Sequence, residues 1–135
     1  MFRNRNVNNR ADGETGGRSQ SSPLVIVLPI RIKSRNVLDR LHWAAKRRDK
    51  QEYALLIRNQ MRLNKIKFAD KKKYAISIVS IRKKKLDYDN LIGGCKHLID
   101  ALIDEQFIFD DSPDYLDLKV EQVVSNDYQT IISRK

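Results

Sequence analysis

The sequence has a single cysteine, Cys95, among 135 residues. One cysteine cannot form an intrachain disulfide or a cysteine-based zinc site, so a disulfide scaffold and a zinc finger are excluded. Long apolar runs are also missing: none reaches the roughly 18 to 20 residues that span a bilayer, and residues 1–22 lack the apolar stretch of a secretory signal. We therefore expect a cytoplasmic protein with no membrane segment, in which any metal is bound by oxygen atoms or, less plausibly, by His42 and His97.

Apolar residues are almost absent from residues 1–22, which consist largely of Asn, Arg, Gly and Ser. Such a segment buries too little apolar surface to offset the entropy lost on ordering. The composition predicts a flexible tail over 1–22 and one folded domain over 23–135.

The net charge of +10 is distributed unevenly along the chain. Residues 1–30 carry 4 basic and 2 acidic groups, residues 31–85 carry 19 and 4, and residues 86–135 carry 4 and 11. A block as basic as 31–85 attracts polyanions and releases counterions when it contacts phosphates, so nucleic acid is the expected partner. A solvated helix face rich in Lys and Arg explains the composition alone about equally well.

Hydrophobic periodicity predicts alternating strands and helices. Two runs rich in β-branched residues, 24–30 and 74–81, are typical of strands. An apolar stripe from Leu38 to Met61 predicts one long helix that Asn36 caps, and the clearest helical spacing covers 91–103.

The last part of the chain alternates apolar and polar residues over 116–121, and a second short run covers 128–133. The turn-forming residues between them predict a β-hairpin. The order strand, helix, strand, helix, strand, strand predicts a single α+β domain, in which helices pack on one face of a small mixed sheet.

Two aspartates directly follow the strand predicted over 74–81. If Asp87 and Asp89 lie on extended backbone, their i, i+2 spacing points both carboxylates to the same side. Mg²⁺ prefers oxygen ligands and would relieve the repulsion between the two charges. An N-cap role at the start of the next helix explains Asp89 at least as well.

Two more groups lie near these aspartates in the sequence. At about 100° per residue, a regular helix places Lys96 and Asp100 within about 20° of the direction of Asp89, where Lys96 would reach a phosphate. An i, i+4 ion pair between Lys96 and Asp100 is an equally good reading. Asp110 and Asp111 follow an apolar run, and a turn there either returns one carboxylate to the first two aspartates or is simply solvated.

In this combination, the motifs resemble the RusA family of Holliday junction resolvases and related phage-type endonucleases. The matching segments, in the family's order, are Asp87-x-Asp89-Asn90-Leu91, Lys96, Asp100-Ala101-Leu102 and Asp110-Asp111-Ser112. The resemblance implies a small homodimeric α+β nuclease that nicks four-way junctions or other branched DNA in recombination and repair. It also implies Mg²⁺ as the cofactor, with Mn²⁺ as a substitute, and no small-molecule cofactor.

Carried over residue by residue, the resemblance assigns metal binding and catalysis to Asp87, Asp89 and Asp111, and a catalytic role to Lys96. The chain departs from the family at Gly93-Gly94-Cys95, which looks like a three-residue insertion before the lysine. Two glycines there would loosen the helix and reposition Lys96.

The basic residues that flank the strand predicted over 74–81 are the candidates for DNA phosphate contacts. They are Lys71, Lys72, Lys73, Arg82, Lys83, Lys84 and Lys85. The competing functional class is a non-catalytic nucleic-acid-binding protein that uses the basic block 31–85. That class explains the charge but not the spacing of the aspartates.

Overall fold

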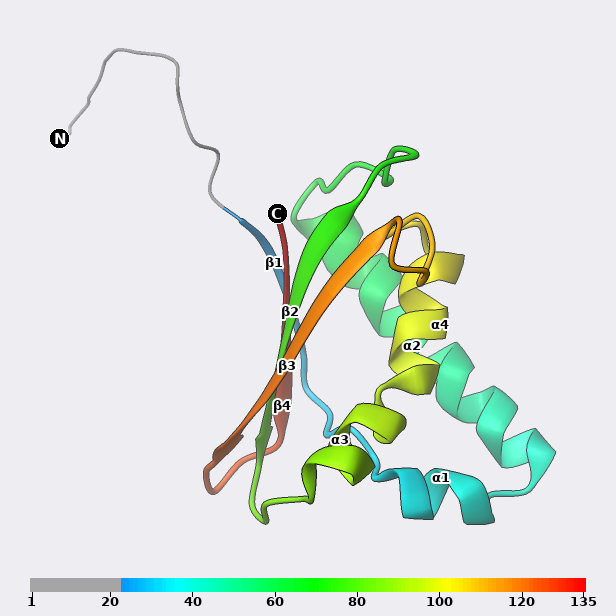
Figure 1. The fold of residues 1–135 in the computed structure, drawn as a ribbon, viewed down its shortest axis with the longest axis vertical. Coiled ribbons are helices and arrows are strands. Elements are labelled where there is room, and N and C mark those ends of the chain that lie inside the picture. The colour runs from blue at the N-terminus through cyan, green and yellow to red at the C-terminus, as the bar shows by residue number, and fades with distance from the viewer. Residues whose placement is uncertain (1–22) are drawn as a thin grey trace, which may run out of the picture.

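The computed structural model describes residues 23–135, and the flexible tail predicted over 1–22 lies outside the described residues. Within the described residues, two pairs of helices separate the first three of four strands (Figure 1). They are β1 (Leu24–Leu28), α1 (Arg35–Arg40), α2 (Trp43–Leu63), β2 (Tyr74–Arg82), α3 (Tyr88–Gly94), α4 (Lys96–Asp104), β3 (Leu116–Val124) and β4 (Gln129–Arg134).

The strands form one mixed sheet in the order β1-β4-β2-β3, and the helices lie on one side of it (Figure 1). β4 pairs antiparallel with β1 and β2, whereas β2 and β3 run parallel and are joined through α3 and α4. Every second residue of β2 is buried, as expected for a strand with one face against the core. The predicted α+β class, mixed sheet and placement of the helices are confirmed.

The predicted hairpin between the last two strands is wrong, because β2 lies between β3 and β4. The connection from β3 crosses the end of β2, where the Ser125 N–H donates to the Arg82 carbonyl at 2.9 Å. β4 fills a central position, with Thr130, Ile132 and Arg134 buried. Alternation in the sequence predicted two strands correctly but carries no information on which strands pair.

The predicted long helix is broken into α1 and α2, and its cap is Ser34 instead of Asn36. The Ser34 hydroxyl accepts from the Val37 N–H at 3.2 Å, which satisfies an unpaired donor at the start of α1. Leu41 adopts extended backbone and ends α1, and His42 caps α2 by accepting from the Ala44 N–H through Nδ1 at 3.3 Å. Two side-chain caps within nine residues therefore favour two helices.

The helix predicted over 91–103 is also divided, at Cys95. A Cβ added to Gly94 would lie 2.0 Å from the carbonyl oxygen of Lys33, so only glycine allows the segment after β1 to pass this close. The helix is divided directly after the two glycines, as expected, and the close passage of the Lys33 backbone explains why residue 94 has no side chain.

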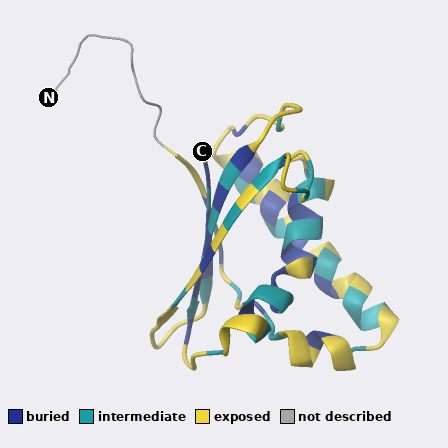
Figure 2. Cartoon of the chain, viewed as in Figure 1, coloured by how far each residue is buried: buried dark blue, intermediate teal, exposed yellow. Residues whose placement is uncertain are grey.

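The core lies between the sheet and the helices, where Figure 2 shows the buried residues. Ile26, Ile78 and Ile132 of the sheet are fully buried, as are Ile57 of α2 and Leu98 of α4. No helix within residues 23–135 is long and apolar enough to cross a membrane.

Arg134 is buried at the end of β4, a core position that the sequence pattern did not predict. Its guanidinium donates to the carbonyls of Phe107 and Lys67 at 2.8 and 3.1 Å, and lies over the rings of Tyr74 and Phe107. Burial lowers the pKa of Arg134 from its usual value. An arginine remains charged after such a shift, so this side chain ties two loops to the sheet as a buried cation.

Candidate active site

The first two candidate aspartates do not lie on extended strand. β2 ends at Arg82, Asp87 is the N-cap residue of α3, and Asp89 lies in its first turn. The Asp87 carbonyl accepts from the Leu91 N–H at 3.0 Å, but its side chain makes no capping hydrogen bond and is exposed, like that of Asp89. The strand geometry predicted for this pair is therefore wrong, and the N-cap position belongs to Asp87 instead of Asp89.

The segment that precedes Asp87 is held against β3 by a residue that sequence reasoning missed. Gln122 brackets Leu86: its side-chain oxygen accepts from the Leu86 N–H at 2.9 Å, and its nitrogen donates to the Leu86 carbonyl at 2.8 Å. Asp87 lines a pocket beside this clamp, together with Glu121 and Tyr88. The alternation of β3 contained the signal, because it places polar Gln122 on the same face as Leu118 and Val120.

A second pocket, of about 420 Å³, lies between α4 and β3 and collects the other candidates. Lys96 and Asp100 line it from α4, and Asp111 lines it from the loop before β3. Apolar side chains, among them Ile99 and Leu118, form the rest of its wall. The fold thus brings Lys96 and Asp111, 15 positions apart in the sequence, to one concave surface.

Asp100 pairs across helices instead of along its own helix. Its carboxylate lies 3.5 Å from the Lys50 ammonium of α2, and within residues 23–135 no ion pair joins it to Lys96. The i, i+4 pair predicted as an alternative for Lys96 and Asp100 is therefore wrong. Lys96 is exposed at the pocket, where its ammonium has no carboxylate partner within ion-pair distance among the described residues.

Asp87 and Asp111 line different pockets and join the sheet at opposite ends of the β2–β3 pair. β2 and β3 pair in parallel over nine residues, from Tyr74 opposite Leu116 to Arg82 opposite Val124, a distance of about 26 Å along the strands. Asp87 follows the end of β2 and Asp111 precedes the start of β3, so the two leave the sheet at opposite ends. In the described part of the chain, no three His, Cys, Asp or Glu side chains are grouped closely enough to hold a metal ion.

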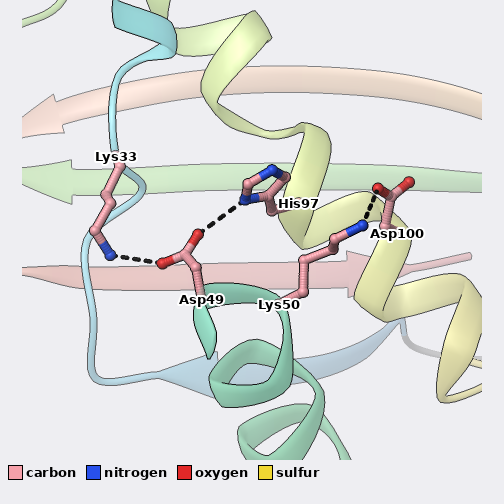
Figure 3. A network of polar contacts seen from close by, with 5 residues as sticks. All are labelled: Lys33, Asp49, Lys50, His97 and Asp100. Atoms are coloured by element: carbon pink, nitrogen blue, oxygen red, sulfur yellow. Dashed lines mark hydrogen bonds and ion pairs between the residues drawn. The ribbon is translucent and has the colours of Figure 1, made fainter. Parts of the chain in front are cut away.

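An ionic network centred on the buried Asp49 joins α2 to α4 and to the segment after β1 (Figure 3). The Asp49 carboxylate of α2 is 4% exposed; one oxygen accepts from the Lys33 ammonium at 2.6 Å, and the other lies 3.1 Å from Nδ1 of His97. His97 is the residue after Lys96, so this contact orients the first turn of α4. The sequence contained a signal, since Asp49 falls on the same helical stripe as Tyr53 and Ile57.

Among the candidate phosphate contacts, Arg82 serves the fold instead. Its side chain is 5% exposed and donates to the carbonyls of Ile32 and Lys84, both at 2.9 Å. Burial, and then the neighbouring Arg31, lower the pKa of Arg82. A guanidinium that donates to two backbone carbonyls is not free to bind DNA, which argues against Arg82 as a phosphate contact.

The lysine candidates are exposed but do not form one surface. The run 71–73 precedes β2 and the run 83–85 follows it, so the strand separates them by about 26 Å. The second run lies at the end of the sheet that also carries Asp87. The first lies at the end where β3 begins and Asp111 approaches the sheet.

A comparison of the chain with protein-family models and with curated proteins finds no match. The resemblance to the RusA family therefore depends on the motif over residues 87–112, and the function that it implies is a proposal.

Proposed function

We propose that the chain is a cytoplasmic, Mg²⁺-dependent endonuclease that nicks branched DNA, most plausibly Holliday junctions in recombination and repair. The observation that carries the proposal is the pocket between α4 and β3, where Lys96 and Asp111 face the same space. These are two of the four residues to which the RusA-like motif assigns chemistry. A concave site with a lysine and carboxylates suits a phosphodiester substrate.

The donor chemistry fits the proposed metal. Asp87, Asp89 and Asp111 offer carboxylate oxygens, and all three are exposed. Mg²⁺ keeps several waters and is often bound by only one or two carboxylates together with substrate phosphates, so a preformed cluster of three ligands is not required. When bound, the ion supplies an activated water and neutralises charge on the phosphodiester oxygens.

The roles of the protein groups follow from their positions. Asp111 would bind the metal in the pocket, and Lys96 would place its ammonium beside the scissile phosphate and stabilise the charge that develops there. The contact between Asp49 and His97 would hold the start of α4, and therefore Lys96, in a fixed position. Asp87 and Asp89 do not line this pocket, so they would join the metal site only if the start of α3 shifts toward Asp111 in the DNA complex.

A homodimer is part of this proposal, because two copies place one site on each of two opposed strands of a junction. The side of the sheet that carries no helix offers a surface for the second copy (Figure 1). Val27, Ile131 and Val79 form a row across β1, β4 and β2 on this side and are half-buried. Sedimentation of the wild type beside a Val79→Lys variant measures whether this face joins two copies.

The decisive experiment incubates the protein with a synthetic four-way junction in Mg²⁺, in Mn²⁺ and in chelator. We expect nicking only with metal, and a loss of about 100-fold or more in Asp111→Asn and in Lys96→Ala. Asp114→Asn is the matched control, because Asp114 is an exposed acid of the same loop that does not line the pocket. A wild type that binds junctions but never nicks them in either metal would overturn the nuclease proposal.

The competing candidate is a non-catalytic protein that binds nucleic acid through residues 31–85. The exposure of the lysine runs 71–73 and 83–85 favours it, because these side chains can contact phosphates without a metal. The same experiment decides between the two, since a non-catalytic protein binds the junction equally well with and without metal and leaves it intact.

A further inference from the structure

Trp43, the first residue of α2, is a large aromatic side chain left outside the core. It is 66% exposed, although indole rings usually bury most of their surface. An exposed tryptophan beside basic side chains indicates a surface that binds a partner.

Basic side chains lie beside this ring and along the groove next to it. The Arg47 guanidinium, one helical turn along α2, lies 5.6 Å from the centre of the indole. A groove of about 400 Å³ runs from Trp43 past Lys46, Arg47 and Lys50, and Asp104 of α4 is its acidic residue. Three cations and one anion give the groove a net positive charge beside an aromatic platform.

This combination matches the chemistry of unpaired nucleic acid. Single strands bind to positively charged grooves in which aromatic side chains stack on the bases, and arginine adds a cation–π contribution. A duplex offers phosphates to the cations but keeps its bases stacked on each other. The indole therefore distinguishes single strands from duplexes.

The groove also adjoins the candidate active site. Lys50 lines the groove, and its ammonium lies 3.5 Å from Asp100, which lines the pocket with Lys96 and Asp111 (Figure 3). Trp43 precedes Lys50 by seven residues of one helix, or roughly 10 Å along its axis. A single strand with a phosphate at the pocket would thus have a nucleotide within reach of the indole.

We propose that the groove of Trp43, Lys46, Arg47 and Lys50 binds single-stranded DNA, with a base stacked on the exposed face of the Trp43 indole. The role of this site in cleavage rests on the nuclease function proposed above: it would bind the unpaired strand next to the cleavage point. Binding of the strand itself does not depend on metal or on cleavage.

Trp43 provides its own probe, because it is the only tryptophan in the sequence. The full-length protein in chelator is titrated with oligodeoxythymidylate, with a blunt DNA duplex and with heparin, while indole fluorescence is recorded. Stacking predicts strong quenching by the single strand and little by the other two polyanions. Equal quenching by heparin would overturn the proposal, since a polyanion without bases can only act through the cations.

The affinity of two variants for a labelled single-stranded oligonucleotide measures how much the Trp43 ring contributes to binding. Trp43→Leu should weaken binding of the single strand by about fivefold or more, the loss typical of a deleted base–aromatic stack. Phe68→Ala is the matched control: Phe68 is an exposed aromatic of similar exposure, 65%, that does not line the groove. Circular dichroism confirms that each variant is folded. Unchanged affinity in Trp43→Leu, or an equal loss in Phe68→Ala, would overturn the groove assignment.

The salt dependence of the affinity for single strands gives a second, independent measurement. Arg47→Ala should reduce the dependence of log affinity on log salt concentration by about 0.7, the value for one phosphate contact on a single strand. An unchanged slope would exclude Arg47 from the binding site. The two proposals can fail separately. If the protein does not nick junctions, only the nuclease proposal fails; if single strands do not quench the indole fluorescence, only the single-strand site fails.

Discussion

Replacement of Gly94 by alanine tests the close passage of the Lys33 backbone at the end of α3. The added Cβ would lie 2.0 Å from the Lys33 carbonyl oxygen and 3.3 Å from the Ile32 side chain. Ordinary contact begins at 3.4 Å, so the two backbones must separate by about 1.4 Å. Ile32 is fully buried and Lys33 is tied to Asp49, so this segment cannot move away without disturbing the core.

The expected magnitude combines two opposing effects. Alanine gains about 1 kcal/mol over glycine in a helix, whereas overpacking in a tight core costs about 1 to 3 kcal/mol. Because the obstacle is buried backbone, we take the upper end and expect a net loss of about 2 kcal/mol in the free energy of unfolding. For a domain of this size, that loss lowers the melting temperature by about 6 to 8 °C.

Gly93→Ala is the matched control, one residue earlier in the same helix. The three atoms nearest its Cβ all belong to Arg35, at 2.4 Å for Cδ, 2.9 Å for Cγ and 2.8 Å for Cβ. Rotation of this exposed side chain relieves the contacts with Cδ and Cγ, and a small shift at the surface-exposed start of α1 relieves the contact with Cβ. The gain in helix propensity then offsets most of the strain, and we expect stability within about 1 kcal/mol of the wild type. Thermal and urea unfolding by circular dichroism give both values. A Gly94→Ala variant as stable as Gly93→Ala would refute the close passage as the reason for glycine.

Two more predictions concern buried groups. Asp49→Ala should lower the free energy of unfolding in urea by about 2 kcal/mol, because it leaves His97 and the Lys33 ammonium without their acceptor. The loss is smaller than for a fully buried pair, since the Lys33 side chain is 36% exposed and regains water; a change below about 0.5 kcal/mol would contradict the network. Burial raises the pKa of the Cys95 thiol to about 12, so a thiol reagent at pH 8 should react only as fast as the protein unfolds. The unfolded thiol loses its proton from about pH 9, so between pH 9 and 12 the free energy of unfolding should fall more steeply in the wild type than in Cys95→Ala; parallel slopes would rule out this linkage.

Local patterns in the sequence were sufficient for the class of the fold. Alternating burial of β2 and the apolar stripe of α4 follow from periods of two and 3.6 residues, which depend only on neighbours in the chain. The order of strands and helices then restricts the domain to a sheet with helices packed against it. For the same reason, the RusA-like motif over 87–112 and the basic block 31–85 could be found without coordinates.

Tertiary structure alone decided which elements meet. The sequence of β4 suits a hairpin with β3 or a central place between β1 and β2, and only burial of the whole sheet selects the second. The parallel pairing of β2 with β3 then moves Asp87 and Asp111 to opposite ends of the sheet, while the crossover through α4 brings Lys96 to Asp111. Gly94 and Arg82 are similar cases, since the carbonyls that they approach, Lys33 and Ile32, lie 61 and 50 residues away in the sequence. Periodicity describes the face that a segment buries, but its partners depend on contacts between distant segments, which no local pattern contains.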